Sequence, residues 1–260
     1  NVILWYESAI VRGERLRVPS PGILTCRFKD MTSLGGYVLC VVLFPFGPFL
    51  RRAPSLPGSA AAKEAPLVVL VHGLNNNAAA WLYIARRLTA AGCIVSTYTY
   101  SSLFVPLQSI VDGLEKHVRQ LEAVPGAGKP VLVGHSLGGI LIREWLRRPG
   151  NHARASGGVT LGTPHTGSKL AVFAPGALAK NLKPGSPLLQ ELEASSPPPL
   201  PCVSIVSTFD EAVLPSFRLL PPEGWKLRIS APLGHFSMLF SASTANILIE
   251  EIEAMPEAAD

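Results

Sequence analysis

Short apolar runs rich in β-branched residues alternate with stretches of helical periodicity from about residue 67 onward. This alternation predicts an α/β fold with a mainly parallel central sheet and helices on both faces, because parallel neighbours need a long, usually helical connection. The runs are continuous rather than alternating, which is typical of strands covered on both faces. In chain order, the expected elements are a strand at Leu67–Val71, a helix at Ala78–Ala91, a strand at Ile94–Tyr100, a helix at Leu107–Glu122, a strand at Val131–Val133, a helix at Leu137–Arg148, three strands at Gly158–Leu161, Cys202–Val206 and Leu227–Ser230, and a helix at Ala242–Ile252.

The part of the chain before this alternation has a different character. Residues 31–50 contain no charged side chain and are flanked by basic residues on both sides, which favours a membrane anchor. Pro45 and Pro48 interrupt a helix, so the anchor either spans the bilayer or lies in its interface; the alternative is a helix packed on the following domain. We therefore expect three parts: an N-terminal apolar segment and candidate membrane anchor (1–52), a Pro-, Gly- and Ser-rich linker (53–66) and a main domain (67–260).

Composition narrows the class of partner. Hydrophobic residues make up 48% of the chain and charged residues 16%, with a mean hydropathy of +0.31, which favours contact with lipid and a membrane-associated or exported protein over a cytoplasmic one. The formal charge is +5, but Lys and Arg are scattered and no aromatic-and-basic module is present. The sequence therefore predicts a solvated basic surface and no nucleic-acid partner.

The four cysteines are Cys26, Cys40, Cys93 and Cys202, and their spacing is not that of metal ligands. Cys93 and Cys202 lie in apolar runs, which favours buried thiols. A disulfide between Cys26 and Cys40 is the alternative for an exported chain.

One serine lies in a glycine-rich turn between a predicted strand and a predicted helix. The turn reads Gly134-His135-Ser136-Leu137-Gly138, and its glycines permit a sharp bend that exposes the hydroxyl above the sheet. A serine hydroxyl becomes a useful nucleophile only when a base takes its proton. We expect Ser136 to be such a nucleophile; the alternative is an ordinary glycine-rich turn.

The loop after the first strand reads His72-Gly73-Leu74. A backbone N–H from this loop and one from the residue after the nucleophile can stabilise a developing oxyanion. Leu74 and Leu137 are therefore the predicted donors. His72 comes before the serine, against the expected chain order of nucleophile, acid and base, so we interpret it as structural.

The same chain order selects the base and the acid. His235 follows the last predicted strand and precedes the final helix, where it can reach the turn at Ser136. His165 is the competing base, but no strand separates it from the serine turn to carry an acid. Asp210 directly follows a strand and is the predicted acid, with its neighbour Glu211 as the alternative.

About three quarters of the chain, from residue 67 onward, resembles bacterial α/β-hydrolase lipases of the triacylglycerol lipase and related esterase group. The motifs that carry this resemblance are Val-Leu-Val-His-Gly-Leu at 69–74, Val-Gly-His-Ser-Leu-Gly-Gly at 133–139, Thr-Leu-Gly-Thr-Pro-His-Thr-Gly-Ser at 160–168 and Gly-His at 234–235. The resemblance implies an α/β-hydrolase fold. It also implies that the Gly-Thr-Pro-His run shapes the floor of the site, so that His165 has a supporting role.

The same resemblance implies that residues 168–199 are a lid or cap insertion, either a mobile amphipathic lid or a fixed helical cap. Several lipases of this group bind calcium through acidic residues near the catalytic histidine. The segment 234–243 has no acidic residue, so we expect no calcium requirement, no other metal and no cofactor.

Together these features predict a serine carboxylic-ester hydrolase, a lipase or esterase, that acts on lipid esters through an acyl-enzyme on Ser136. The expected partners are a lipid or other ester and a membrane surface. Two alternatives remain: an acyltransferase that uses the same acyl-enzyme, and a non-catalytic, membrane-tethered binding protein with the same fold.

Overall fold

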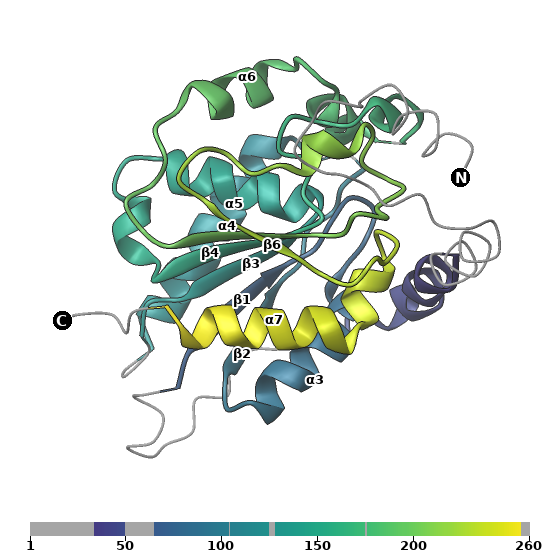
Figure 1. The fold of residues 1–260 in the computed structure, drawn as a ribbon. Coiled ribbons are helices and arrows are strands. Elements are labelled where there is room, and N and C mark those ends of the chain that lie inside the picture. Colours follow the sequence, from purple (N-terminus) through teal and green to yellow (C-terminus); the bar gives the residue numbers. More distant parts are fainter. Residues whose placement is uncertain (1–33, 50–64, 104, 125–127, 175, 256–260) are drawn as a thin grey trace.

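Six parallel strands form one sheet in the order β2-β1-β3-β4-β5-β6 (Figure 1). The structure is a computed structural model that describes residues 34–49, 65–103, 105–124, 128–174 and 176–255. The strands are β1 (Leu67–Val71), β2 (Ile94–Tyr98), β3 (Val131–His135), β4 (Gly157–Leu161), β5 (Cys202–Val206) and β6 (Lys226–Ile229). The predicted parallel α/β architecture is confirmed.

The strand order reverses at β1. The chain runs from β1 to its neighbour β2 at one edge, then returns to pair β3 on the other side of β1 and continues outward through β4, β5 and β6. Because all strands point the same way, their carboxyl ends meet at one edge of the sheet. In such folds ligands bind in the crevice outside these ends, where the order reverses.

Helices cover both faces of the sheet (Figure 1). The helices α4 (Leu107–Glu122) and α5 (Leu137–Arg147) lie on one face, and α3 (Leu82–Ala90) and α7 (Ala242–Glu253) lie on the other. The side chains of β1 alternate between the two resulting cores, with Val69 in the core under α4 and α5 and Val68 in the core under α3 and α7. This two-sided burial explains why the strand sequence is apolar at every position.

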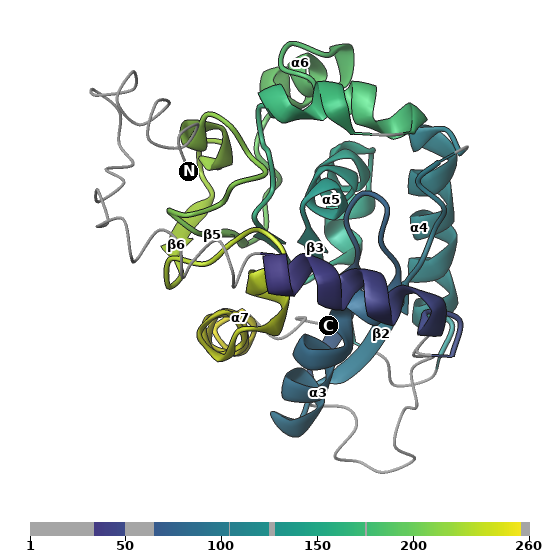
Figure 2. The ribbon, with the colours of Figure 1, turned by 90° about the vertical axis from the view of Figure 1, so that its right-hand side faces the viewer.

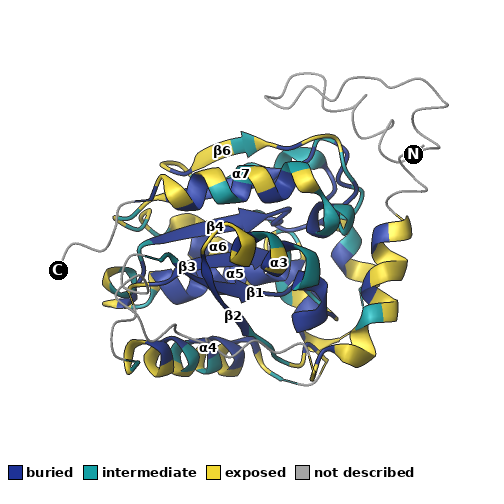
Figure 3. Ribbon diagram, turned by 90° about the horizontal axis from the view of Figure 1, so that it is seen from below, coloured by how far each residue is buried: buried dark blue, intermediate teal, exposed yellow. Residues whose placement is uncertain are grey.

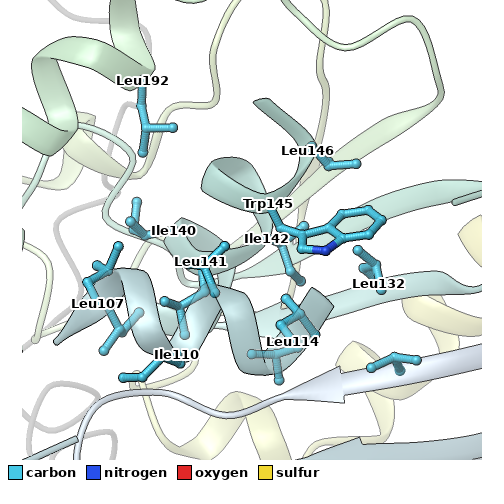
Figure 4. Close-up of a cluster of buried hydrophobic side chains, with 14 of the residues drawn as sticks. Leu107, Ile110, Leu114, Leu132, Ile140, Leu141, Ile142, Trp145, Leu146 and Leu192 are labelled. Carbon is cyan, nitrogen blue, oxygen red and sulfur yellow. The ribbon is translucent and has the colours of Figure 1, made fainter. Parts of the chain in front are cut away.

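Helix α5 lies at the centre of the larger core. Ile140, Leu141, Ile142 and Trp145 are all fully buried, and they pack beside Leu114 of α4 (Figure 4). Figure 3 shows that the central strands are buried while β6, at the edge of the sheet, is largely exposed. The expectation of strands covered on both faces is therefore wrong for β6, in which the basic residues Lys226 and Arg228 alternate with Leu227 and Ile229, whereas the other edge strand, β2, is largely buried.

The expected cap is helical. It consists of η5 (Lys169–Phe173), η6 (Ala177–Leu182) and α6 (Pro187–Ala194), and Figure 2 shows this region above α5. Leu178, Leu182, Leu189 and Leu192 belong to the same buried cluster as the side chains of α5. The inner side of the cap is thus continuous with the main core.

Residues 34–46, here called the apolar helix, form an α-helix at 34–43 that continues directly into the tighter turn η1 (Phe44–Phe46). Figure 2 shows it crossing one end of the molecule, near α7 and α3. Within the described part of the chain, no helix is long and apolar enough to cross a membrane. Most of the expected linker, and Cys26, lie outside the described residues; Cys40, Cys93 and Cys202 are buried free thiols.

Several element boundaries differ from the sequence expectation by one or two residues, and one predicted helix begins with a different kind of turn. Strand β2 ends at Tyr98, two residues earlier than expected, and the helix expected at Ala78–Ala91 begins with the tighter turn η3 (Ala78–Trp81) before α3. The Asn77 side chain accepts a hydrogen bond from the Ala79 N–H and so caps this turn.

Candidate active site

Ser136 lies at the turn between β3 and α5, in a conformation that side chains rarely adopt. Its φ of 54° and ψ of −120° place it in a strained region of backbone space. Neighbouring groups hold it there: the Ser136 N–H donates to the Leu161 carbonyl at 2.9 Å, and the Thr163 hydroxyl donates to the Ser136 carbonyl at 3.1 Å. Backbone strain that the surroundings maintain is typical of functional sites.

The turn requires glycine at Gly138. A Cβ at this position would lie 2.2 Å from the Val71 carbonyl oxygen, closer than any real contact. Glycine therefore allows the first turn of α5 to lie directly against the end of β1. This packing brings the Ser136 turn next to the loop at Gly73 and Leu74.

Asp210 and His235 form a buried pair. The Asp210 Oδ2 atom lies 2.7 Å from His235 Nδ1, and the side chains are 0% and 3% exposed. The other carboxylate oxygen, Oδ1, accepts hydrogen bonds from the N–H groups of Ala212 (2.9 Å) and Val213 (3.0 Å). Burial alone would lower the pKa of His235, but the charge and hydrogen bond of Asp210, with the charge of Glu211, raise it above its ordinary value.

Glu211 contacts the same histidine at a different place. Its Oε2 accepts a hydrogen bond from the His235 backbone N–H at 3.0 Å. The two adjacent acids that the sequence left as alternatives are thus divided: Asp210 holds the ring and Glu211 holds the main chain.

Gly162 lies next to the Asp210–His235 pair. It has a φ of 54°, and a Cβ here would come within 3.0 Å of Asp210 Oδ2 and 3.2 Å of His235 Nδ1. The Gly-Thr-Pro-His run therefore contributes a glycine to the site, because a side chain at its first position would displace the pair.

Ser136 and His235 both line a cavity of about 580 Å³ at the carboxyl ends of the strands. Gly73 and Leu74 line it as well, so the loop predicted to supply an oxyanion donor lies at the cavity. Leu137 begins α5, and N–H groups in the first turn of a helix have no acceptor within the helix. Most of the remaining wall is apolar.

His72 is completely buried and serves the loop rather than the cavity. The Tyr100 N–H donates to its Nε2 at 3.1 Å, so the ring proton lies on Nδ1, which donates to the Gly73 carbonyl at 2.8 Å. The ring also stacks on Tyr100, with the ring centres 4.1 Å apart. Burial lowers the pKa of His72 to about 4, so the ring is neutral at ordinary pH.

His135, in the variable position of the serine turn, is also buried. Its Nε2–H donates to the His235 carbonyl at 3.1 Å, and the two rings lie 4.6 Å apart. Burial has the largest effect on the pKa of His135 and, with the charge of the neighbouring His235, holds it well below the ordinary value. Sequence reasoning assigned no contact to this residue, because nothing in the motif indicates that the turn touches the loop of the distant histidine.

His165 lies elsewhere, in a buried polar cluster between the sheet and the cap. Its Nε2 is 3.1 Å from the Ser204 hydroxyl, and its carbonyl accepts a hydrogen bond from Arg143 at 2.9 Å. Arg143 also donates to the Leu192 carbonyl of α6 at 2.9 Å. The structure therefore separates His165 from Asp210 and identifies Arg143, which the sequence did not single out, as a buried residue that joins α5 to the cap.

Among the residues that the structure describes, no group of three or more His, Cys, Asp or Glu side chains lies together as metal ligands would.

The fold and the placement of these motifs define a class: an α/β protein with a serine at the strand-to-helix turn and an acid–histidine pair at the carboxyl edge of the sheet. The model of the alpha/beta hydrolase family matches residues 68–253. The chain belongs to this family.

Solved structures show the same fold at low sequence identity. The mature form of Bacillus licheniformis lipase BlEst2 is 20% identical with a TM-score of 0.61, and the match covers 77% of this chain and 96% of that one. Aspergillus fumigatus lipase B is 16% identical with a TM-score of 0.66, covering 78% of this chain and 56% of that one. Paleococcus ferrophilus monoacylglycerol lipase is 17% identical with a TM-score of 0.53, covering 72% and 96%. A comparison with curated protein sequences finds no match.

Proposed function

We propose that this protein is a serine carboxylic-ester hydrolase that acts on lipid esters, with Ser136 as nucleophile, His235 as base and Asp210 as acid. One observation carries the proposal: the Asp210–His235 contact of 2.7 Å belongs to a histidine that lines the same cavity as the strained Ser136. An orienting carboxylate, a base and an exposed serine are the parts that acyl transfer requires.

In the first half of the reaction, the Ser136 hydroxyl oxygen attacks the ester carbonyl carbon and its proton moves to His235 Nε2. The carbonyl oxygen takes the negative charge, which the N–H groups of Leu74 and Leu137 stabilise. The bond to the leaving alcohol then breaks, and His235 returns the proton to that alcohol.

In the second half, His235 takes a proton from water, and the hydroxide oxygen attacks the acyl-enzyme carbonyl. The bond to Ser136 breaks, the serine recovers the proton and the carboxylic acid leaves. Asp210 holds the histidine ring and stabilises the charged imidazole.

The apolar lining of the cavity supports a lipid substrate. Leu170, Ala171 and Leu182 from the cap side and Val41 and Phe44 from the apolar helix line it, and acyl chains bind such surfaces through the hydrophobic effect. The three similar proteins named above are also lipases by name, one of them a monoacylglycerol lipase.

We also propose that the protein meets its substrate at a lipid surface, the membrane-associated location favoured by the composition. Large apolar side chains are exposed beside the cavity: Phe173, in the same short helix as Leu170, is 83% exposed, and Val42 of the apolar helix is 58% exposed. Exposed apolar groups that surround a site are typical of membrane or partner contact.

The direct test of the chemistry is Ser136→Ala. Turnover of p-nitrophenyl esters should fall by about a thousandfold or more, and labelling by a fluorophosphonate probe should disappear. Ser109→Ala, at an exposed position on α4, is the matched control and should change neither. Retention of esterase activity by Ser136→Ala would refute the assignment, and failure of the folded wild-type chain to react with the probe would favour a non-catalytic binding protein.

The same acyl-enzyme can transfer its acyl group to an alcohol instead of water, and an apolar cavity disfavours water. Product analysis with and without glycerol or a long-chain alcohol distinguishes the two reactions. A dominant transesterified product at low acceptor concentration would make the protein an acyltransferase.

A further inference from the structure

The apolar helix lies outside the segment that matches the family, yet it forms part of the cavity wall. The family match begins at residue 68, whereas the cavity lining includes Tyr37, Cys40, Val41, Phe44 and Pro45. One side of the candidate substrate site is therefore built by a part of the chain that lies outside the segment matching the family.

The residues that line the cavity follow helical spacing. Cys40 and Val41 follow Tyr37 by three and four positions, and Phe44 follows them by four and three. Residues with this spacing lie on one face of a helix. Cys40, on this face, is 5% exposed; Tyr37 and Val41 line the cavity and remain 51% and 53% exposed, and Val38 and Val42, at 48% and 58%, do not line it. The helix thus has a side that faces the cavity and a side that faces away.

Specific contacts hold the helix in this position. The Asn77 side-chain amide donates to the Phe44 carbonyl at 2.7 Å, and the Cys40 thiol is hydrogen-bonded to Asn76. Tyr37 packs edge-on against Phe236, with the ring centres 5.4 Å apart. The attachment points lie close to the site in sequence, since Asn76 follows Leu74 by two residues and Phe236 follows His235 directly.

We infer that the apolar helix determines acyl-chain selectivity, with Val41 and Phe44 as the residues that set the space available to the chain. This inference rests on the proposed ester hydrolysis. A chain bound in the cavity of about 580 Å³ contacts this wall, so changes in the volume of the wall should alter the binding of long chains more than that of acetyl groups.

Phe44 is also part of a second wall: it lines a neighbouring cavity of about 500 Å³ with Asn75, Asn76, Thr99 and Tyr100. Phe44 therefore lies between the two spaces. A smaller residue here enlarges the room for the acyl group, whereas a larger residue at Val41 reduces it.

The experiment measures kcat/KM for p-nitrophenyl acetate, octanoate and palmitate in the full chain and its variants. Val41→Trp should lower the palmitate-to-acetate ratio of kcat/KM by about tenfold or more, because a filled pocket discriminates by chain length. Phe44→Ala should raise the same ratio. Val42→Trp is the matched control, because it adds the same side chain to the face that does not line the cavity.

Each result has a distinct meaning. An unchanged ratio in both Val41→Trp and Phe44→Ala, or an equal change in Val42→Trp, would overturn the inference while leaving ester hydrolysis intact. An equal loss for all chain lengths in Val41→Trp would also overturn it. If the wild-type chain hydrolyses none of the three esters, the proposed function itself fails, and the inference fails with it.

Discussion

Replacing Asp210 by Asn tests the role of the carboxylate oxygen that contacts His235 Nδ1. Asparagine has nearly the shape of aspartate, and its Oδ1 can still accept the N–H groups of Ala212 and Val213, which lie 2.9 and 3.0 Å from the carboxylate in the native chain. These two donors fix the orientation of the amide. Its NH₂ group must then face His235 Nδ1, where the carboxylate oxygen now lies at 2.7 Å.

An amide NH₂ can only donate, so His235 Nδ1 becomes an acceptor and the ring proton moves to Nε2. In that tautomer Nε2 cannot take the proton of Ser136. Loss of the correct tautomer lowers kcat by about ten thousandfold in a serine hydrolase of known mechanism, which corresponds to about 5.4 kcal/mol at about 1.36 kcal/mol per factor of ten.

The assay is steady-state hydrolysis of p-nitrophenyl acetate or butyrate, together with thermal unfolding to verify that the variant folds. Glu211→Gln is the matched control, since a glutamine oxygen can still accept the His235 backbone N–H that Glu211 accepts at 3.0 Å. We expect this control to lose less than about tenfold, because the ring contact is intact. If Asp210→Asn keeps activity within tenfold of wild type, or if Glu211→Gln is as damaged as Asp210→Asn, the assignment of the acid is wrong.

Three further results follow from the structure. Since Asp210 and Glu211 raise the pKa of His235, kcat/KM of the wild type should fall as the pH drops through a value above 6.5. In Asp210→Asn, the residual activity should fall only at a lower pH than in the wild type. A fall that begins below pH 6.5 in the wild type would contradict the direction of the pKa shift. Arg143→Met removes the donor to the buried His165 carbonyl and one of the two donors to the Leu192 carbonyl, and should cost about 2–4 kcal/mol, a fall in Tm of roughly 5–15 °C. Arg148→Met, which breaks only exposed contacts, should change Tm by at most about 3 °C. Phe173→Asp should weaken sedimentation with phosphatidylcholine vesicles while leaving hydrolysis of soluble acetate esters unchanged, and equal vesicle binding would argue against this surface as the lipid contact.

Most strands and helices could be predicted from the sequence because their burial produces a regular pattern of apolar residues. Strands β1 and β5 and helix α4 begin and end at the predicted residues, since two-sided burial gives a continuous apolar run and one-sided burial gives a helical stripe. Residues at element ends depend on local contacts instead. The turn at Ala78–Trp81, for example, is capped by Asn77, a side chain that also holds Phe44 from a distant segment.

The components of the candidate site could be selected by chain order, but not their contacts with one another. Motif and order single out Ser136, Asp210 and His235, because each follows a strand whose end lies at one edge of the sheet. They do not indicate that His135 donates to the His235 carbonyl. That contact joins residues 100 positions apart, and it depends on how two loops meet above the sheet.

The apolar helix shows most clearly where a sequence pattern is insufficient. Residues 31–50 are apolar on all sides, so their periodicity selects no face, and an anchor and a packed helix remain equally compatible with the pattern. The deciding groups lie elsewhere: Asn77, which holds the Phe44 carbonyl, and Phe236, which packs against Tyr37. In the folded chain one face of the helix contacts the cavity and the other remains exposed and apolar. This packing is compatible with the interfacial location that we propose, because a helix that packs with one face on the cavity leaves its other face available to a lipid surface.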